Sequence, residues 1–340
     1  MSIRFIARLT PGVKAGGTRA SRAELSYPRS PMKPVRGPAG HGWRVIEDAA
    51  STPIGSWRTV LALPQGPLAR RVEAVWASEG FDCFEEEEIL PRSRTNVLFG
   101  LGERHWLRDP TTPERDRAFD GSFVSGLQGR PLHVQSPPAS RMAGVRLKPE
   151  GAAAFLRDTP SAIAGEVVGL DEILGPEVDR LREQIASTRD LRERALLLAA
   201  AVARHLEPAP GPPDAVRFAL DVLHASRGAA PIRELVRASG HSHRWLTEQF
   251  RAEVGLAPKA YARLVRFEAA FDALCALDKV RWAEFALDAG YYDQAHLVRD
   301  FRELAGATPS EVFRRRAPDG LGLLSDEEAM RLRAGPQARS

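Results

Sequence analysis

Two stretches of the chain, residues 242–258 and 293–309, place polar side chains on the same frame of apolar, glycine and proline residues. The corresponding frame members are Ser242 and Asp293, Leu246 and Leu297, Phe250 and Phe301, Gly255 and Gly306, and Pro258 and Pro309. Between them stand Arg244, Thr247 and Glu248 in the first stretch, and Gln294, His296 and Arg299 in the second. Arginine can donate to both acceptors of guanine, glutamine can pair with adenine, and glutamate can accept from cytosine N4. These residue types suit contacts with DNA base edges; the alternative for each is a solvated helix face or a phosphate contact.

Local signals in both stretches predict a helix that presents these polar residues. Ser242 or Asp293 can cap its first turn, and the Leu and Phe of each frame stand four residues apart and so face one core. Each frame glycine tolerates the positive φ of a helix end. A short amphipathic segment, PIRELVRASG or RWAEFALDAG, precedes each stretch and ends at Gly240 or Gly290. The pattern predicts two helix-turn-helix units, whose second helices enter the DNA major groove.

The segment between the two units, residues 258–276, predicts one continuous helix. At 1.5 Å per residue its length is roughly 28 Å, so it can hold two recognition helices near the roughly 34 Å repeat of successive major-groove faces. Further along, Thr308 and Glu311 form a capping box with Pro309 at the first helical position, which predicts a final basic helix, EVFRRR. His241 and His243 have no neighbouring cysteine, and we interpret them as a turn residue and a helix-start residue rather than metal ligands.

The run GYYDQAHLVRDFRELAGATP at residues 290–309 carries a resemblance to a known family. With the first unit and the connecting helix, residues 216–316 resemble the DNA-binding domain of AraC/XylS-type transcription regulators. The resemblance implies two helix-turn-helix motifs bridged by a long helix, a regulatory N-terminal domain and, often, dimers. Tyr291 stands where the family usually carries Phe, and we expect the same pocket to accept it. Glu248 stands where members often carry a basic residue, so we expect the first helix to read bases less strongly than the second.

The preceding part of the chain changes from a strand pattern to a helix pattern. Short segments between residues 57 and 147, such as VEAVWASE, TNVLFGLG and AGVRLKP, are punctuated by Gly and Pro at strand spacing. Residues 151–206 instead place apolar residues at helical intervals. The expected fold class is therefore α+β: a β-rich sandwich or barrel-like N-terminal domain closed by helices, followed by an all-α C-terminal domain with two helix-turn-helix motifs joined by a long helix.

The β-rich part resembles, more loosely, the sensory half of the same regulators, through PRSRTNVLFGLG, SFVSGL and GVRLKPEGA. The resemblance implies an effector pocket inside the β structure. Trp76, Phe99, Phe123 and Val145 are the candidate lining residues, and their alternative role is core packing. Glu85 to Glu88 are interpreted as a solvated strand or loop.

Length and composition predict the domain organisation. A chain of 340 residues suggests two domains, and EPAPGPP at residues 207–213 has the composition of an exposed linker. We expect a disordered tail over residues 1–50, with Met1 or Met32 as the start, a β-rich domain over 51–206, a DNA-binding domain over 214–316 and a C-terminal tail over 317–340. That tail can form one more exposed helix. Two cysteines, no signal peptide and no long apolar run favour a cytoplasmic protein away from membranes.

Signatures of enzymes are missing from the chain. The segment at residues 100–105 lacks the third glycine of a dinucleotide loop, and no Walker A sequence or G-x-S-x-G elbow occurs. His105 and His133 are too few for a cupin-type metal site. We predict no enzyme activity, cofactor or metal, and a transcription regulator that binds double-stranded DNA and responds to a small-molecule effector, with a homodimer and RNA polymerase as further partners. Two alternatives stay open: a DNA binder whose N-terminal domain only dimerises, and an enzyme or sugar binder whose helical half docks a partner.

Overall fold

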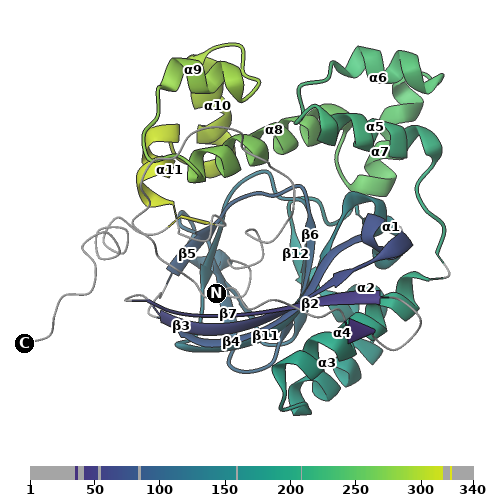
Figure 1. The fold of residues 1–340 in the computed structure, drawn as a ribbon, viewed down its shortest axis with the longest axis vertical. Coiled ribbons are helices and arrows are strands. Elements are labelled where there is room, and N and C mark those ends of the chain that lie inside the picture. Colours follow the sequence, from purple (N-terminus) through teal and green to yellow (C-terminus); the bar gives the residue numbers. More distant parts are fainter. Residues whose placement is uncertain are drawn as a thin grey trace, which may run out of the picture.

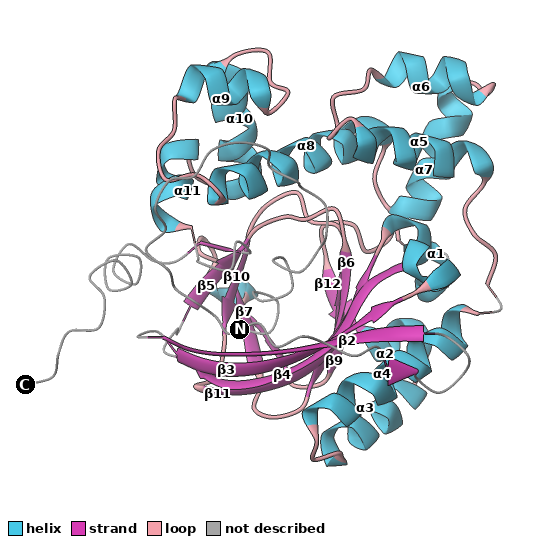
Figure 2. Cartoon of the chain, viewed as in Figure 1, coloured by secondary structure: helices cyan, strands magenta, loops and turns pink. Residues whose placement is uncertain are grey.

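The computed structural model describes residues 35–36, 42–52, 55–82, 86–157, 160–207, 209–316 and 322–323. A β-rich N-terminal domain lies beneath a helical C-terminal domain, as Figures 1 and 2 show. This agrees with the fold class that the sequence predicts. In the described residues, no helix is both long and apolar enough to cross a membrane.

Two antiparallel sheets form the N-terminal domain. The larger has the order β1-β2-β3-β4-β11-β6-β9-β12, and the smaller has the order β13-β5-β10-β7-β8. The strands are β1 Val35–Arg36, β2 Gly42–Thr52, β3 Gly55–Pro64, β4 Val72–Asp82, β5 Glu86–Ile89, β6 Thr95–Gly100, β7 His105–Arg108, β8 Arg117–Phe119, β9 Ser122–Ser125, β10 Leu132–Gln135, β11 Ala139–Leu147, β12 Val167–Gly169 and β13 Gly322–Leu323.

Alternation along the strands gives the larger sheet two buried faces. On β11, Val145 joins the main core with the helices α1 Pro149–Leu156, α2 Leu170–Leu174, α3 Glu177–Ser187 and α4 Leu191–Leu206. Its neighbour Gly144 lies opposite Trp76 of β4 and belongs to the other face. A Cβ on Gly144 would lie 2.6 Å from the Trp76 ring, so only glycine lets the indole cross this strand.

Seven helices build the C-terminal domain in the described residues. They are α5 Asp214–Ala225, α6 Ile232–Ser239, α7 His243–Val254, α8 Pro258–Cys275, α9 Trp282–Asp288, α10 Gln294–Ala305 and α11 Pro309–Arg315. One apolar core gathers α5, α6, α7 and the first half of α8, and a second gathers the rest of α8 with α9, α10 and α11. In Figure 1, α8 runs between these two groups.

The repeated frame occupies equivalent places in both groups. Each frame Leu and Phe is fully buried, and the caps Ser242 and Asp293 accept backbone N–H groups at 3.2 and 2.6 Å. Gly255 and Gly306 end α7 and α10 with φ of 96° and 65°. Thr308 and Glu311 form the predicted capping box at the start of α11. The local signals that predicted these helices therefore coincide with their observed ends.

The helical domain is packed against the β-rich domain. Leu127 joins the core of the first helix group, and Leu90 and Leu323 join the core of the second. At the same boundary, Arg315 of α11 is ion-paired with Glu88 of β5 at 2.6 Å. The two helix groups thus do not close their cores from local residues alone.

Three expectations about segments were wrong in part. Residues 42–50 belong to β2, where Trp43 and Val45 are buried, so the tail predicted over 1–50 is too long; Met1 and Met32 lie outside the described residues. In the predicted tail 317–340, Leu323 is fully buried in a strand that pairs with β5; the helix predicted there lies outside the described residues. The segment 207–213 does connect α4 to α5, yet Arg71 donates to the Leu206 and Ala209 carbonyls at 2.8 and 2.7 Å.

The acidic run is not simply solvated. Glu86 is exposed, but Glu87 is only 5% exposed because β5 turns alternate side chains toward the space between the sheets. Glu85 lies outside the described residues.

Candidate functional site

The second helix of the second unit, α10, presents two of its three candidate DNA-contacting residues to solvent. Gln294 and Arg299 are exposed. His296 is half-buried: its Nδ1 accepts the Tyr292 N–H at 3.4 Å, and its Nε2 lies 3.9 Å from the carboxylate of Asp300. Contacts within the protein therefore hold the His296 ring, whereas Gln294 and Arg299 can reach a DNA groove.

In α7, the second helix of the first unit, the candidate arginine is ion-paired within the helix, unlike Arg299 of α10. The Nε of Arg244 donates to Glu248 at 2.8 Å, four residues on, and both side chains are well exposed. Thr247 is half-buried beside them. An ion pair with Glu248 reduces the charge that Arg244 offers to a nucleic acid. The weaker base reading expected of the first helix stays a prediction.

The helix that bridges the units is attached to both of them by polar contacts. On one side, Asp300 of α10 is only 5% exposed and accepts from Arg263 at 2.7 Å and Arg266 at 3.1 Å, both of α8. On the other side, Tyr261 of α8 is hydrogen-bonded to His224 of α5 at 2.9 Å. Burial lowers the pKa of His224 to about 4, so its ring is neutral near neutral pH. These contacts fix both units relative to α8.

Sequence reasoning missed one exposed aromatic residue beside α10. Tyr292 is 87% exposed, while its neighbour Tyr291 is buried at 3% in the second helical core. The burial of Tyr291 confirms that the core accepts tyrosine there. The exposure of one tyrosine could have been predicted, because only one of two adjacent tyrosines before a capped helix can face the core.

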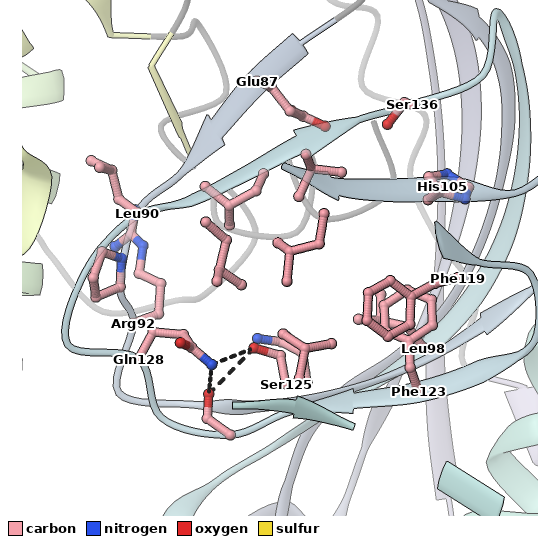
Figure 3. A pocket seen from close by; sticks show the side chains of 18 of the residues that line it. Glu87, Leu90, Arg92, Leu98, His105, Phe119, Phe123, Ser125, Gln128 and Ser136 are labelled. Atoms are coloured by element: carbon pink, nitrogen blue, oxygen red, sulfur yellow. Dashed lines mark hydrogen bonds between the residues drawn. The ribbon is translucent and has the colours of Figure 1, made fainter. Parts of the chain in front are cut away.

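A large pocket lies between the two sheets of the N-terminal domain. It encloses about 980 Å³, open solvent at its mouth included. Its middle is apolar and has polar groups toward both ends, as Figure 3 shows. The apolar lining includes Ile89, Leu98, Leu107, Phe119, Phe123, Leu132, Val134 and Met142. Mostly apolar walls with a few polar groups are characteristic of small-molecule sites in proteins.

Three buried polar side chains of this pocket have an atom without a hydrogen-bond partner among the described residues. Gln128 donates its amide NH₂ to Ser125, Gly126 and Glu166, which leaves its Oε1 without a partner. His105 Nδ1 and Ser136 Oγ are likewise without a partner. Burial lowers the pKa of His105 to about 4, so its imidazole is neutral near neutral pH. Because buried polar atoms almost always have partners, a ligand is a physical explanation for these three.

Arg92 lies at one end of the pocket (Figure 3), and Arg94 and Arg146 are also among the lining residues. The same three residues line a second cavity, of about 740 Å³ with open solvent included, between the two domains. Arg94 and Arg146 share the buried carboxylate of Glu73. Although burial alone would raise it, these two arginines hold the pKa of Glu73 at about 2.

The second cavity also contains groups of α8. Asp272 accepts from Arg92 at 2.6 Å, and Glu268 accepts from the backbone N–H of Ser93 at 3.0 Å and from its hydroxyl. Burial would raise the pKa of Glu268, but Arg94, Arg92 and the Ser93 hydrogen bonds hold it below its ordinary value. One cluster of charges therefore connects the pocket in the β-rich domain to the helix between the two helix-turn-helix units.

The structure does not bring the four candidate effector residues together. Phe123 lines the pocket, whereas Phe99 lies on the opposite face of the larger sheet, beside a separate cavity under α3 and α4. Trp76 and Val145 are packed in the core and line neither space. The expectation of one shared lining was wrong, because neighbouring residues of a strand face opposite sides of the sheet.

Sequence reasoning missed the polar lining residues of the pocket. Arg146 was detectable, because in the run VRL it stands between two apolar residues that a strand turns to the opposite face. Gln128 and Ser136 lie outside strands, and no pattern in the sequence marks them. No group of three metal-binding side chains occurs among the residues that the structure describes.

Comparisons with known proteins address the two domains separately. The sequence model of a helix-turn-helix domain family matches residues 235–315, and a domain of unknown function, DUF6597, matches residues 61–169. No curated protein sequence matches the chain.

Solved structures of low overall similarity were also found. ToxT from Vibrio cholerae O395 covers 68% of this chain and 93% of its own at 9% identity, with a TM-score of 0.38. An unsaturated fatty acid-bound ToxT from Vibrio cholerae strain SCE256 covers 68% and 91% at 10% identity, with a TM-score of 0.37. The AraC-like transcriptional activator CuxR covers 65% and 79% at 12% identity, with a TM-score of 0.22.

The family match covers α10 and nearly all of the paired units. Two helix-turn-helix units, each with a capped second helix, are held by one bridging helix, and the exposed face of α10 carries arginine and glutamine side chains. With the match over residues 235–315, this arrangement identifies the chain as a DNA-binding transcription regulator of the AraC/XylS type.

Proposed function

We propose that this regulator responds to a small molecule bound between the sheets of its N-terminal domain. The observation that carries the proposal is that Arg92, Arg94 and Arg146 line both that pocket and the cavity against α8. A ligand at this end of the pocket changes the electrostatic environment of Glu268 and Asp272. Since α8 holds both DNA-binding units, a shift of α8 alters how well the two units fit one duplex.

The proposal assigns the DNA contacts as follows. Arg299 and Gln294 of α10 read base edges, with His296 beside them. In α7, Arg244, Thr247 and Glu248 contact a second major-groove segment and contribute less to the free energy of DNA binding. The support is the exposure of Arg299 and Gln294 and the pairing of Arg244 with Glu248. Homodimerisation and contact with RNA polymerase belong to the same proposal, as does the division into a β-rich domain, which includes β2 from Gly42, and a DNA-binding domain over 214–316.

A coupling experiment tests the ligand response. An operator is first obtained by selecting bound sequences from random duplex DNA, and its affinity is then measured for the wild type and for Glu268→Gln. This change keeps the shape of the side chain but removes the charge that faces the three arginines. We expect its operator affinity to differ from the wild type by several-fold, although residue 268 lies on α8, far along the chain from both second helices.

The matched control is Glu303→Gln. Glu303 also belongs to an ion pair with α8, through Arg263, but it does not line the cavity between the domains. Equal affinities for the wild type and Glu268→Gln, together with no effect of any pocket ligand on DNA binding, would instead favour an N-terminal domain that only dimerises.

A further inference from the structure

Three buried polar atoms of the pocket between the sheets have no hydrogen-bond partner in the described part of the chain. They are Gln128 Oε1, His105 Nδ1 and Ser136 Oγ, in side chains that are 6%, 5% and 8% exposed. Figure 3 shows Gln128 on the side of Arg92, and His105 and Ser136 across the pocket from it, with aliphatic side chains between them. A ligand that bonds to all three atoms therefore has an apolar middle and a polar group at each end.

The arginines beside the pocket are already paired with carboxylates of the protein. Arg94 and Arg146 share the carboxylate of Glu73. Arg92 is ion-paired with Asp272 at 2.6 Å. A ligand carboxylate would have to break one of these pairs to reach a guanidinium, at a cost in free energy where the pair is buried. The pairing therefore favours an uncharged ligand.

The amide of Gln128 determines which group fits at one end of the pocket. Its NH₂ donates to Ser125 Oγ and to the carbonyls of Gly126 and Glu166, at 3.2, 3.1 and 3.0 Å. These bonds orient the amide, so its Oε1 is the atom that a ligand can contact. Because an amide oxygen only accepts hydrogen bonds, the ligand group beside Gln128 has to be a donor.

The opposite end requires a group that both donates and accepts. Ser136 Oγ can do either, and the imidazole of His105 is neutral near neutral pH because burial lowers its pKa to about 4. A neutral imidazole presents either a donor or an acceptor at Nδ1, according to its tautomer. A hydroxyl group of the ligand satisfies both side chains in either case.

We propose that the pocket binds an uncharged amphipathic diol, with an apolar body and a hydroxyl at each end. One hydroxyl donates to Gln128 Oε1, and the other is bonded to Ser136 and His105. This ligand class rests on the proposed ligand response of the N-terminal domain. Such a ligand leaves the ion pairs of the three arginines intact.

Gln128 also lies next to a contact between the domains. Its neighbour Leu127 is buried in the core that α5, α6, α7 and the first half of α8 share. The Leu127 carbonyl accepts from the backbone N–H of Gly165 at 2.9 Å, which holds this segment in place. A hydroxyl bound to Gln128 therefore acts on a segment that contacts the first helix-turn-helix unit, and it does so without a change in charge.

The test uses the full chain and a probe series measured by calorimetry without DNA. The series comprises the straight-chain α,ω-diols from hexanediol to dodecanediol and, for each length, the alkanol, the α,ω-dimethoxyalkane and the ω-hydroxy acid. We expect the best diol to bind about three- to tenfold more tightly than its alkanol, which leaves one end of the pocket without a partner. The dimethoxyalkane cannot donate to Gln128, so it should bind roughly tenfold or more weakly than the diol.

The hydroxy acid separates an uncharged ligand from an anion. At neutral pH its carboxylate cannot donate to Gln128 Oε1, and its charge is costly to bury. We expect it to bind roughly tenfold or more weakly than the diol of the same length. An acid or a dimethoxyalkane that binds as tightly as the diol overturns the proposed ligand class, and so does the absence of binding by every diol.

Two serine variants test the end opposite Gln128. In Ser136→Ala, the preference for the diol over the alkanol should fall by about threefold, because the second hydroxyl loses a partner. The matched control is Ser122→Ala: Ser122 is also buried with an Oγ that has no partner among the described residues, but it does not line the pocket. An equal preference in both variants would overturn the position of the second hydroxyl.

The best diol is then added to the operator-binding assay as a separate measurement. If it binds the pocket with the expected preferences but leaves operator affinity unchanged, the ligand class stands and the proposed ligand response fails. If a hydroxy acid changes operator affinity and no diol does, the ligand response stands and the ligand class fails.

Discussion

At the scale of single residues, the fully buried Phe301 is the clearest test of the repeated frame. Its ring contacts that of Phe267 on α8, with 5.0 Å between centroids. Phe301→Ala should lower the free energy of unfolding by about 3 to 5 kcal/mol, because it leaves a cavity in the second helical core, and DNA binding should fall with the local fold. Denaturant unfolding measures this. The control is Leu287→Ala, on a side chain that is 62% exposed, and an equally small loss for both variants would contradict the assigned anchor.

Arg299 tests whether α10 reads bases. Its exposed side chain has no hydrogen bond or ion pair with the described residues, so Arg299→Ala removes only what it does on DNA. We expect a loss of about 1 to 3 kcal/mol in operator binding and relaxed sequence preference in one protected segment. Arg244→Ala should act in the other segment with a smaller effect, because Arg244 is paired with Glu248. Site selection on both variants measures this. If the variant instead lost affinity for all sequences alike, and the slope of log affinity against log salt concentration fell in magnitude by about one, Arg299 would be a phosphate contact.

The buried carboxylate of Glu73 predicts how stability depends on pH. Burial raises its pKa, but Arg94 and Arg146 outweigh burial and hold the value at about 2, below the ordinary 4.5. Its folded-state pKa is thus depressed, so its contribution is complete above about pH 4.5 and is lost as pH falls toward 2. The wild type should lose about 3 kcal/mol more than Glu73→Gln across that interval. Denaturant unfolding at a series of pH values measures this difference. The control is Glu183→Gln, at an exposed position, and the free energy of unfolding of this variant should change with pH as that of the wild type does.

At the scale of elements, α8 determines the spacing of the two second helices. The contacts of Asp300 with Arg263 and Arg266 and of Tyr261 with His224 attach both units to this helix. One protomer should therefore protect two major-groove segments on the same face of the duplex, about 10 to 11 base pairs apart. Hydroxyl-radical footprinting measures this. A single protected segment per protomer would contradict simultaneous contact by α7 and α10.

The helices of the C-terminal domain were predictable from the sequence because their signals are local. Asp293, Phe301 and Gly306 lie within four turns of one another and specify the start, core face and end of α10. The pairing of strands was less predictable. Trp43 and Val45 alternate as a buried strand does, but they follow a segment rich in Arg, Pro and Gly that indicated disorder. Which face of the sheet receives Phe123 and which receives Phe99 depends on pairing between distant segments, and composition does not reveal it.

At the scale of the whole molecule, the boundary between the domains can be tested with a fragment. Residues 214–316 contain both helix-turn-helix units, and we expect this fragment to fold and to bind operator DNA by itself. Its stability should be lower than in the full chain, because Leu127, Leu90 and Leu323 no longer complete its two cores. Circular dichroism and thermal unfolding measure this. A fragment without helical structure, beside a helical and cooperative full chain, would contradict the proposed boundary.

The contact between the domains was not predictable from the sequence. Leu127 ends the segment SFVSGL and Leu90 follows the acidic run, so both belong to the predicted β-rich part, where their apolar character suits the core of that domain equally well. Glu268 and Asp272 likewise suit the solvated face of a long helix. Only the tertiary structure brings them against Arg92 and Ser93. The candidate site between the two domains therefore could not be predicted from local sequence patterns.

The strand β13 gives the DNA-binding domain a second attachment. The chain enters this domain beside Arg71, which binds the Ala209 carbonyl, and after α11 it returns to pair with β5 through Leu323. Both ends of the DNA-binding domain are therefore tied to the β-rich domain, in addition to the contacts that Leu90, Leu127 and Arg92 make between the domains. A helical domain held at its entry and at its exit can move less relative to the β-rich domain than one that follows a single linker.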